Sequence, residues 1–383
     1  MGSCGRILCT IHDVNLAAVL KSGQSFRWVR LPSEEWVGPL GRHVWILRQD
    51  ESGITFRTLP PPKSEASLDE GKARCFLEDY FQLGVNLREL YSCWSAADEA
   101  FSMAGRRLPG VRMLRQDPVE NLFCFICSSN NNIQRITSMV EKLCERYGEP
   151  LGEHAGRTFH AFPAVSRLAE PAVEAELRAL GFGYRARYVR ETAHQVAERG
   201  GAGWLRALRS VPYATCHGQL RQLCGVGAKV ADCVCLMSLD QPAAVPVDTH
   251  VHQLALRHYL PQLRHTKTLT DRTYRQVADH FRLVFGERAG WAQAVLFCGD
   301  LAEFKKAAAD EASGPAQESA SVRQTVKCPV APAKTTPSKR VRVTAAVVGK
   351  APDVGGDGPI GRTAAARSER GTRQQKRRTP VPR

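Results

Sequence analysis

The sequence predicts an α+β protein of 383 residues: an antiparallel β-sheet region, then a helical region, then a disordered basic tail. Three observations predict this order. Short β-prone runs between turn residues mark the first region, 1–116. Apolar residues at helical spacing mark the second, 117–305. In the third, 306–383, aromatic residues vanish and Ala, Pro, Gly, Ser and Thr dominate, so too little apolar surface is available to offset the entropy of ordering.

The first region contains three β-prone runs separated by Gly, Pro and polar residues, and these predict a meander of antiparallel strands. They are Trp36–Val37, Val44–Leu47 and Ile54–Thr58. The apolar residues of 74–83 fit one face of a helix. Ser22-Gly23-Gln24 predicts a turn near the start of the chain.

The second region opens at Asp117-Pro118, where an aspartate cap followed by proline predicts a helix start. Further on, Ile133, Ile136, Val140, Leu143 and Tyr147 repeat at helical spacing. Arg135 lies off this apolar stripe, so we expect it to be exposed.

The charge is concentrated in the tail. The chain carries a net +15, and 306–383 holds sixteen Lys/Arg against six Asp/Glu, a net of +10 that leaves +5 for the rest. Such a balance indicates a polyanionic partner. The clusters Lys339-Arg340-Val-Arg342 and Lys376-Arg377-Arg378 fit a nuclear import signal or a nonspecific DNA tether, and equally a solvated linker without a role.

Thirteen cysteines, several within apolar runs, indicate buried, reduced thiols. Cys124 and Cys127 have zinc-ligand spacing, but no second pair lies at a suitable distance, so we expect no metal there. No run of about 18 apolar residues occurs, so we expect no membrane partner. We expect the protein to be a monomer.

The most informative stretch is a glycine hairpin. Leu220 and Leu223 end one helix, Gly225-Val226-Gly227 makes a tight connection, and Lys229 begins a second helix. Glycines allow backbone conformations closed to other residues and leave amide N–H groups bare at a helix N-terminus, where an anion is held. This helix-hairpin-helix pattern predicts a grip on DNA phosphate without base reading. The hairpin carbonyls could also hold a monovalent or divalent cation. An ordinary helix-turn-helix corner is the simpler alternative.

Lys229 and Asp248 argue for catalysis rather than passive binding. Asp248 lies in Val245-Pro-Val-Asp248 and is placed to cap the following helix, which could be its whole role. Lys229 must be neutral to act as a nucleophile, and both a helix N-terminus and a partly dry pocket disfavour its ammonium form.

The glycine hairpin, the lysine and the Val-Pro-Val-Asp loop together resemble the helix-hairpin-helix DNA glycosylases. Within that superfamily the sequence is most similar to the eukaryotic 8-oxoguanine DNA glycosylases, over roughly residues 15–304. Five segments in chain order carry the resemblance: 22–28, 128–133, 183–188, 226–233 and 290–297. It implies a TBP-like antiparallel sheet domain before the helical glycosylase core.

The resemblance also implies a mechanism. The damaged nucleotide is flipped out of the duplex. Lys229 displaces the base, forms a Schiff base with the sugar and cleaves the strand by β-elimination. Asp248 stabilises the cationic sugar as the base departs. The substrate is duplex DNA with 8-oxoguanine, or a related oxidised purine, opposite cytosine.

The implied base pocket combines a carbonyl, an amide and two flanking side chains. 8-Oxoguanine has an N7–H donor where guanine has an acceptor, so the Gly23 carbonyl would prefer the lesion. Gln293 would bind the Watson–Crick edge, and Phe297, on the same helix face, would stack on the base. Cys233 would cover the other face and pair as a thiolate with the Lys229 ammonium. The loop residue Pro246 also belongs to this pocket by resemblance.

A second implied group contacts the DNA around the flipped nucleotide. Asn130, Arg135, Tyr184 and Arg185 would fill the vacated space and read the opposite cytosine, for which Asn and Arg have the donors. Without the resemblance, these would be read as a helix cap and solvated surface. His250 would contact a phosphate, with Asp300 orienting it; His250 and His252 lack a third metal ligand.

Two rival functions stay open at this level. One is a related glycosylase of different lesion specificity; relatives with an iron–sulfur cluster carry four cysteines after the core, whereas only Cys298 and Cys328 follow Cys235 here. The other is a non-catalytic DNA-binding protein, against which the Lys229–Asp248 pair counts. The basic clusters predict a nuclear location, and the tail's partners are not specified by its sequence.

Overall fold

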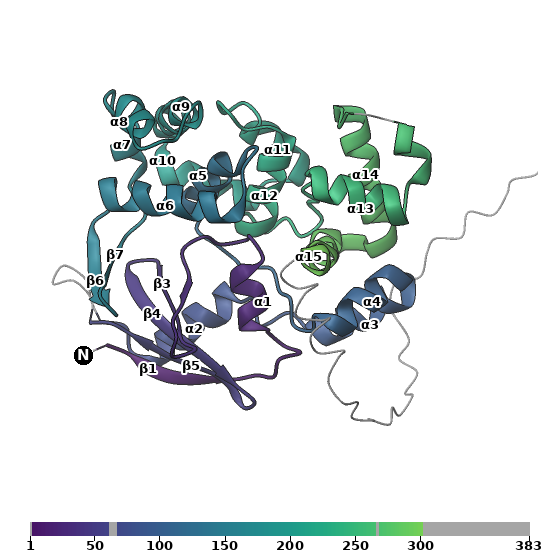
Figure 1. Ribbon diagram of the computed structural model, residues 1–383, viewed down its shortest axis with the longest axis horizontal. Coiled ribbons are helices and arrows are strands. Elements are labelled where there is room, and N and C mark those ends of the chain that lie inside the picture. The colour runs from purple at the N-terminus through teal and green to yellow at the C-terminus, as the bar shows by residue number, and fades with distance from the viewer. Residues whose placement is uncertain (1, 61–66, 266–267, 302–383) are drawn as a thin grey trace, which may run out of the picture. The chain divides into compact units, whose positions relative to one another are not determined.

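The computed structural model describes residues 2–60, 67–265 and 268–301 (Figure 1). The predicted tail and its basic clusters lie outside the described residues. Within the described part, an antiparallel sheet precedes a set of helices, which confirms the predicted α+β class. No described helix is both long enough and apolar enough to cross a membrane.

Five strands form the N-terminal sheet, in the order β1-β5-β4-β3-β2, and a separate hairpin contains β6 and β7. Neighbouring strands are antiparallel throughout. The strands are β1 Cys4–Leu8, β2 Val29–Arg30, β3 Trp36–Leu40, β4 His43–Asp50, β5 Gly53–Thr58, β6 Pro150–His154 and β7 Arg157–His160.

The helices before the glycine hairpin are α1 Leu16–Lys21, α2 Glu70–Tyr80, α3 Leu87–Ala97, α4 Glu99–Arg107, α5 Pro118–Ser128, α6 Ile133–Tyr147, α7 Val165–Leu168, α8 Val173–Ala179, α9 Arg185–Glu198 and α10 Gly201–Ala207. Those of the hairpin and beyond are α11 Tyr213–Leu220, α12 Ala228–Ser238, α13 Thr249–His258, α14 Asp271–Phe285 and α15 Ala289–Asp300. The 3-10 turns are η1 Leu208–Ser210, η2 Pro261–His265 and η3 Gly286–Arg288.

Strand β4 shows how the sheet is covered on both faces. Side chains alternate along a strand, so Trp45 and Leu47 enter one core while Val44 and Ile46 enter another. The second core contains Phe159 from the β6–β7 hairpin. The sequence predicted the three central strands but neither the edge strands β1 and β2 nor this hairpin, which returns from the helical region to cover the sheet.

The largest core lies among the helices and includes residues from well before Asp117. Leu87 and Trp94 of α3 and Phe101 of α4 belong to it. The Trp94 indole N–H donates to the Phe285 carbonyl at 3.2 Å, which ties α3 to the end of α14. The sequence did not predict α3 or α4, and the division at residue 116 stays a prediction.

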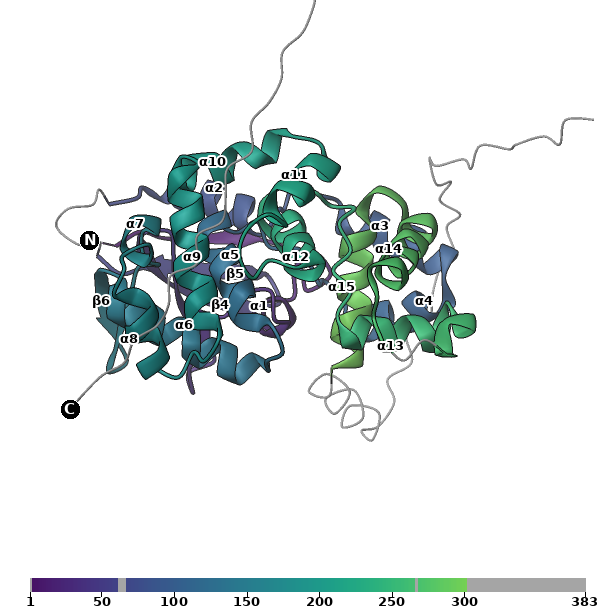
Figure 2. The same ribbon diagram turned by 90° about the horizontal axis from the view of Figure 1, so that it is seen from above.

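Two local predictions in the helical region are confirmed. The Asp117 side chain accepts the N–H groups of Val119 and Glu120, so it caps α5 ahead of Pro118. In α6, Ile136, Val140 and Leu143 of the predicted stripe are buried and Arg135 is exposed, but Ile133 at the start of the stripe is exposed too. Helix α12 lies between α5 on one side and α13, α14 and α15 on the other (Figures 1 and 2).

Candidate active site and DNA interface

The glycine hairpin joins α11 to α12, and its two glycines have different reasons to be glycine. Gly225 has a φ of +74°, and a Cβ built on it would lie 2.4 Å from the Tyr188 ring. Gly227 has extended backbone with open space around it, and it precedes α12 without a side-chain cap. The hairpin therefore packs closely through Gly225 and leaves backbone N–H groups at Gly227 free of bulk, as anion binding at a helix N-terminus requires.

Lys229 lies in the first turn of α12 and is half-buried against α5. Its Nζ donates to Ser128 Oγ at 3.3 Å and lies 4.8 Å from the centre of the Phe125 ring. Ser128 Oγ donates its own hydrogen to the Phe125 carbonyl at 2.7 Å, so its lone pairs are available to the lysine. The amine is thus held in one place without an acidic partner among these contacts.

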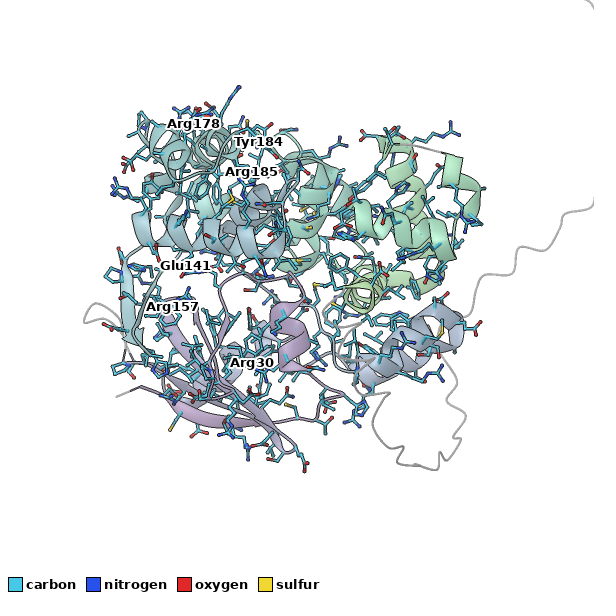
Figure 3. The ribbon with its side chains drawn as sticks, in the orientation of Figure 1. Arg30, Glu141, Arg157, Arg178, Tyr184 and Arg185 are labelled. Atoms are coloured by element: carbon cyan, nitrogen blue, oxygen red, sulfur yellow. The ribbon has the colours of Figure 1, made fainter. Side chains whose placement is uncertain are left out.

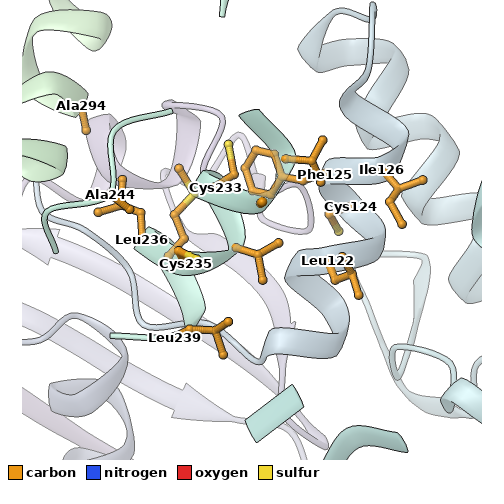
Figure 4. Packing of buried hydrophobic residues seen from close by; sticks show 14 of the residues in the cluster. Leu122, Cys124, Phe125, Ile126, Cys233, Cys235, Leu236, Leu239, Ala244 and Ala294 are labelled. Atoms are coloured by element: carbon orange, nitrogen blue, oxygen red, sulfur yellow. The ribbon is translucent and has the colours of Figure 1, made fainter. Parts of the chain in front are cut away.

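Cys233 lies one turn after Lys229 and beside Phe125 (Figure 4). Burial raises the pKa of this thiol to about 11, although Lys229 hydrogen-bonds it and draws the pKa down. At neutral pH Cys233 is therefore protonated. The predicted thiolate–ammonium pair is wrong for the protein without DNA, because the side chain is only 2% exposed and desolvation outweighs the lysine charge.

Asp248 confirms its predicted role as a cap, since its Oδ1 accepts the Val251 N–H at 2.9 Å at the start of α13. Its negative charge is among the causes that raise the pKa of Cys233. Asp248 and Lys229 therefore both act on Cys233, which places the two predicted catalytic residues around one thiol. Pro246, two residues earlier, is buried.

Gly23 lies in the turn that follows α1, as predicted, with a φ of +78°. The neighbouring Gln24 fixes this turn: its amide donates to the Arg112 carbonyl at 2.9 Å, and its carbonyl accepts the Leu114 N–H at 3.0 Å. Ser22 hydrogen-bonds Cys298 of α15. The turn is thereby anchored next to the helix that carries the predicted base-binding residues.

Gln293 and Phe297 lie one turn apart on α15. Gln293 is 6% exposed, and Phe297 is partly buried with its ring 6.2 Å from that of His250 in an edge-to-face arrangement. His250 itself is exposed in the first turn of α13, as a phosphate contact requires. Arg257 donates to Asp300 at 2.7 Å, so the orientation of His250 by Asp300 stays a prediction.

Two of the residues predicted to fill the duplex, Tyr184 and Arg185, lie close together (Figure 3) and contact the loop between α5 and α6. The Tyr184 hydroxyl donates to the Ser129 carbonyl at 3.0 Å, and the Arg185 guanidinium donates to the carbonyls of Ser129 and Asn130. Arg185 also lies 4.5 Å from the Tyr184 ring. At 3% exposure Arg185 is not the solvated surface side chain of the alternative interpretation. Before DNA binds, it holds the loop in place.

This loop and the hairpin share one surface hollow. Tyr184, Tyr188 and Ser129 line it together with Leu223 and Gly225–Gly227. Asn130 is exposed with a φ of +48°, a conformation that asparagine tolerates better than most residues. The structure thus brings the glycine hairpin and Tyr184 to one hollow, and Arg135 is exposed at the start of α6.

Sequence reasoning missed Phe125 and Ser128, which hold the lysine from α5. The sequence feature that could have indicated their role is their spacing of one helical turn, directly before the Ser-Asn-Asn-Asn run. Over the ranges that the structure describes, no group of three or more His, Cys, Asp or Glu side chains could hold a metal ion.

Two family models match the chain. The N-terminal domain of 8-oxoguanine DNA glycosylase matches residues 6–122, and the HhH-GPD superfamily of base excision DNA repair proteins matches residues 123–279. The chain is 41% identical over 298 residues to N-glycosylase/DNA lyase OGG1 of Arabidopsis thaliana, covering 76% of this chain and 79% of that protein. It is 37% identical over 330 residues to the Saccharomyces cerevisiae N-glycosylase/DNA lyase, covering 78% and 86%.

Among solved structures, the Clostridium acetobutylicum 8-oxoguanine glycosylase/lyase bound to DNA with cytosine opposite 8-oxoguanine is similar, with a TM-score of 0.65 at 27% identity. The match covers 75% of this chain and 91% of that one. Fold, glycine hairpin and the Lys229–Asp248 pair together define the class as a helix-hairpin-helix base excision protein. Within that class, the chain belongs to the 8-oxoguanine DNA glycosylase family.

Proposed function

We propose that this DNA glycosylase and lyase of base excision repair removes 8-oxoguanine paired with cytosine through attack by Lys229. The observation that carries the assignment is the placement of the Lys229 amine. It lies in the first turn of α12 directly after the glycine hairpin, hydrogen-bonds Ser128 and Cys233, and shares Cys233 as a neighbour with Asp248.

The reaction requires the nucleotide to leave the stack, since C1′ is inaccessible in the duplex. The neutral Lys229 nitrogen forms a bond to C1′ as the bond from C1′ to the base breaks, and the base leaves with the electron pair and takes up a proton. Asp248 stabilises the positive charge that develops on the sugar. Opening of the sugar ring gives a Schiff base, and β-elimination then breaks the bond between C3′ and its phosphate oxygen.

Lesion recognition rests on the turn at Gly23 and on α15. The Gly23 carbonyl accepts the N7–H that 8-oxoguanine has and guanine lacks, and a rigid acceptor penalises guanine because two acceptors would face each other. The hydrogen bonds of Gln24 supply that rigidity. Gln293 binds the base edge, and Phe297 and Cys233, together with Pro246, enclose the base.

The DNA around the lesion is held by two groups. The N–H groups of Gly225, Val226 and Gly227 bind a phosphate, and their carbonyls could bind a bridging cation; His250 binds a second phosphate. Tyr184 enters the space of the flipped base. Asn130, Arg135 and Arg185 read the opposite cytosine, and Arg185 must first exchange its backbone carbonyl partners for the base.

The proposal includes three wider assignments. Related oxidised purines that keep the N7–H donor are further substrates, the enzyme acts as a monomer, and its basic tail directs it to the nucleus. A glycosylase for another lesion and a non-catalytic DNA-binding protein are the alternatives that a cleavage assay separates.

The test is borohydride trapping on duplexes with 8-oxoguanine opposite cytosine. The unmodified protein should form a covalent adduct. Lys229→Gln should bind the duplex but form none, whereas Asp248→Asn should excise the base slowly because its charge is lost. An undiminished adduct with Lys229→Gln would assign the nucleophile to another residue.

A further inference from the structure

A buried carboxylate on α12 has no part in the mechanism above. Asp232 directly precedes Cys233 and is fully buried. Both of its oxygens accept phenol hydrogens: Oδ1 from Tyr213 of α11 at 2.6 Å and Oδ2 from Tyr274 of α14 at 2.5 Å. Burying a carboxyl group is costly even when it is hydrogen-bonded, so an apolar residue would serve packing alone at least as well.

The two phenols differ in what else they contact. The Tyr274 oxygen accepts the backbone N–H of Val247 at 3.2 Å, and Val247 directly precedes Asp248. The Tyr213 oxygen instead accepts from Arg282 of α14 at 3.0 Å. Only the Tyr274 branch therefore runs from α12, which carries Lys229, to the loop that carries Asp248.

The acid controls the direction of this chain of hydrogen bonds. A phenol can donate one hydrogen, and the Val245 carbonyl lies 3.4 Å from the Tyr274 oxygen as an alternative acceptor. Because Asp232 takes the hydrogen at 2.5 Å, the lone pairs of Tyr274 are turned to the Val247 N–H. Val247 is fully buried, so no water replaces this acceptor if it is lost.

We propose that Asp232 and Tyr274 are positioning residues that fix the Asp248 carboxylate relative to Lys229 through the Val247 N–H. The proposal rests on the function assigned above, in which Asp248 stabilises the charged sugar during base departure. A shift of about 1 Å in such a group can lower a rate by roughly 100-fold. Base excision should therefore suffer more than steps that need Lys229 alone.

The experiment compares Tyr274→Phe with Tyr213→Phe in the full chain. Each variant keeps the ring and removes one donor from Asp232, but Tyr274→Phe should lower the melting temperature more, because it also leaves the buried Val247 N–H without its acceptor. Tyr274→Phe should reduce single-turnover excision of 8-oxoguanine about tenfold or more, with little change in duplex affinity. Tyr213→Phe should stay within about twofold of the unmodified protein, since the hydrogen bond to Val247 is intact.

A second readout separates positioning from general damage. Borohydride trapping on a duplex with a preformed abasic site needs the Lys229 amine but no base departure, so Tyr274→Phe should trap at a nearly normal rate. If Tyr274→Phe does not fold, Asp232→Asn serves in its place. The asparagine amide donates to the phenol and turns the phenol hydrogen to Val245, and the same selective loss is expected.

The outcomes distinguish this proposal from the function on which it rests. Equal excision rates for Tyr274→Phe and Tyr213→Phe, or equal losses in excision and abasic-site trapping, would overturn the positioning role. If Asp248→Asn excises 8-oxoguanine as fast as the unmodified protein, the role of Asp248 itself fails, whatever the tyrosine variants do.

Discussion

Lys229 and Asp232 lie less than one turn apart on the same helix, yet their surroundings are opposite in kind. Lys229 faces α5 and rests on one hydroxyl, one thiol and one aromatic ring. Asp232 faces α11 and α14, where each of its oxygens accepts a hydrogen bond from a phenol and His217 of α11 lies 3.8 Å from one of them. A nucleophile must be able to leave its partners for the substrate, whereas a group that fixes geometry must not. The contrast indicates that Lys229 is the residue that reacts and that Asp232 is the residue that fixes the geometry of the site.

The largest expected effect is on stability. Asp232→Ala leaves two buried phenols without their acceptor and opens a cavity, so the free energy of unfolding should fall by about 3 kcal/mol. Lys229→Ala removes only weak contacts and should change it by under about 1 kcal/mol. Urea unfolding of both variants measures the difference. Similar decreases in the free energy of unfolding for Asp232→Ala and Lys229→Ala would contradict this difference between the two residues.

The second effect concerns the hairpin that precedes the lysine. Gly225→Ala should weaken binding of damaged and undamaged duplexes alike and cost about 2 kcal/mol of stability, because of the positive φ and the Tyr188 ring. Gly201→Ala is the matched control, because Gly201 lies outside the hairpin, has a φ of +65°, and its Cβ would meet no atom within 4 Å. Duplex affinities at several salt concentrations test this, and a lesion-selective loss for Gly225→Ala would contradict a phosphate role.

The third effect is on lesion choice. Gly23→Ala has to adopt a φ of +78°, which costs roughly 1–2 kcal/mol for a residue with a Cβ, and its Cβ would approach Ile133 to 3.3 Å. The displaced carbonyl should reduce the preference for 8-oxoguanine over guanine. Gly181→Ala, with a φ of +90° in open space, carries a similar strain and should leave that preference unchanged. Competition excision assays on both bases decide the matter.

The smallest effect is a dependence on pH. Because burial raises the pKa of Cys233 from 9.0 to about 11, the unfolded chain loses this proton first as pH rises. The stability that Cys233 contributes is complete below the unfolded pKa and is lost between about pH 9 and pH 11. Between neutral pH and about pH 9.5, the free energy of unfolding should therefore fall by about 1 kcal/mol less in Cys233→Ala than in the unmodified protein. Urea unfolding at both pH values measures this difference. An equal fall in the free energy of unfolding for both proteins would indicate that the Cys233 thiol is exposed to solvent.

Local patterns predicted those parts of the molecule that depend on neighbouring residues. The β-prone run at 44–47, the cap at Asp117 and the hairpin before Lys229 each depend on a few consecutive residues. The β6–β7 hairpin was missed because its turn uses Ala155-Gly156, both at positive φ, rather than the usual Asn-Gly or Asp-Gly.

The support of the site could not be predicted in the same way. Asp232 looks like an isolated acid in an apolar helix until Tyr213 and Tyr274 are brought to it from other helices. Likewise, the sequence alone indicates that Arg185 is a surface residue, whereas in the fold its guanidinium contacts the loop at Ser129. Such contacts depend on tertiary packing, for which one sequence carries no local signal.

The central claim is that the Lys229 nitrogen bonds to the sugar of an everted 8-oxoguanine nucleotide. The most direct measurement is peptide mapping by mass spectrometry of the borohydride-reduced complex between the full chain and an 8-oxoguanine:cytosine duplex. The sugar remnant should be attached to Lys229. A remnant on any other residue, or a reaction that proceeds without a covalent adduct, would contradict it.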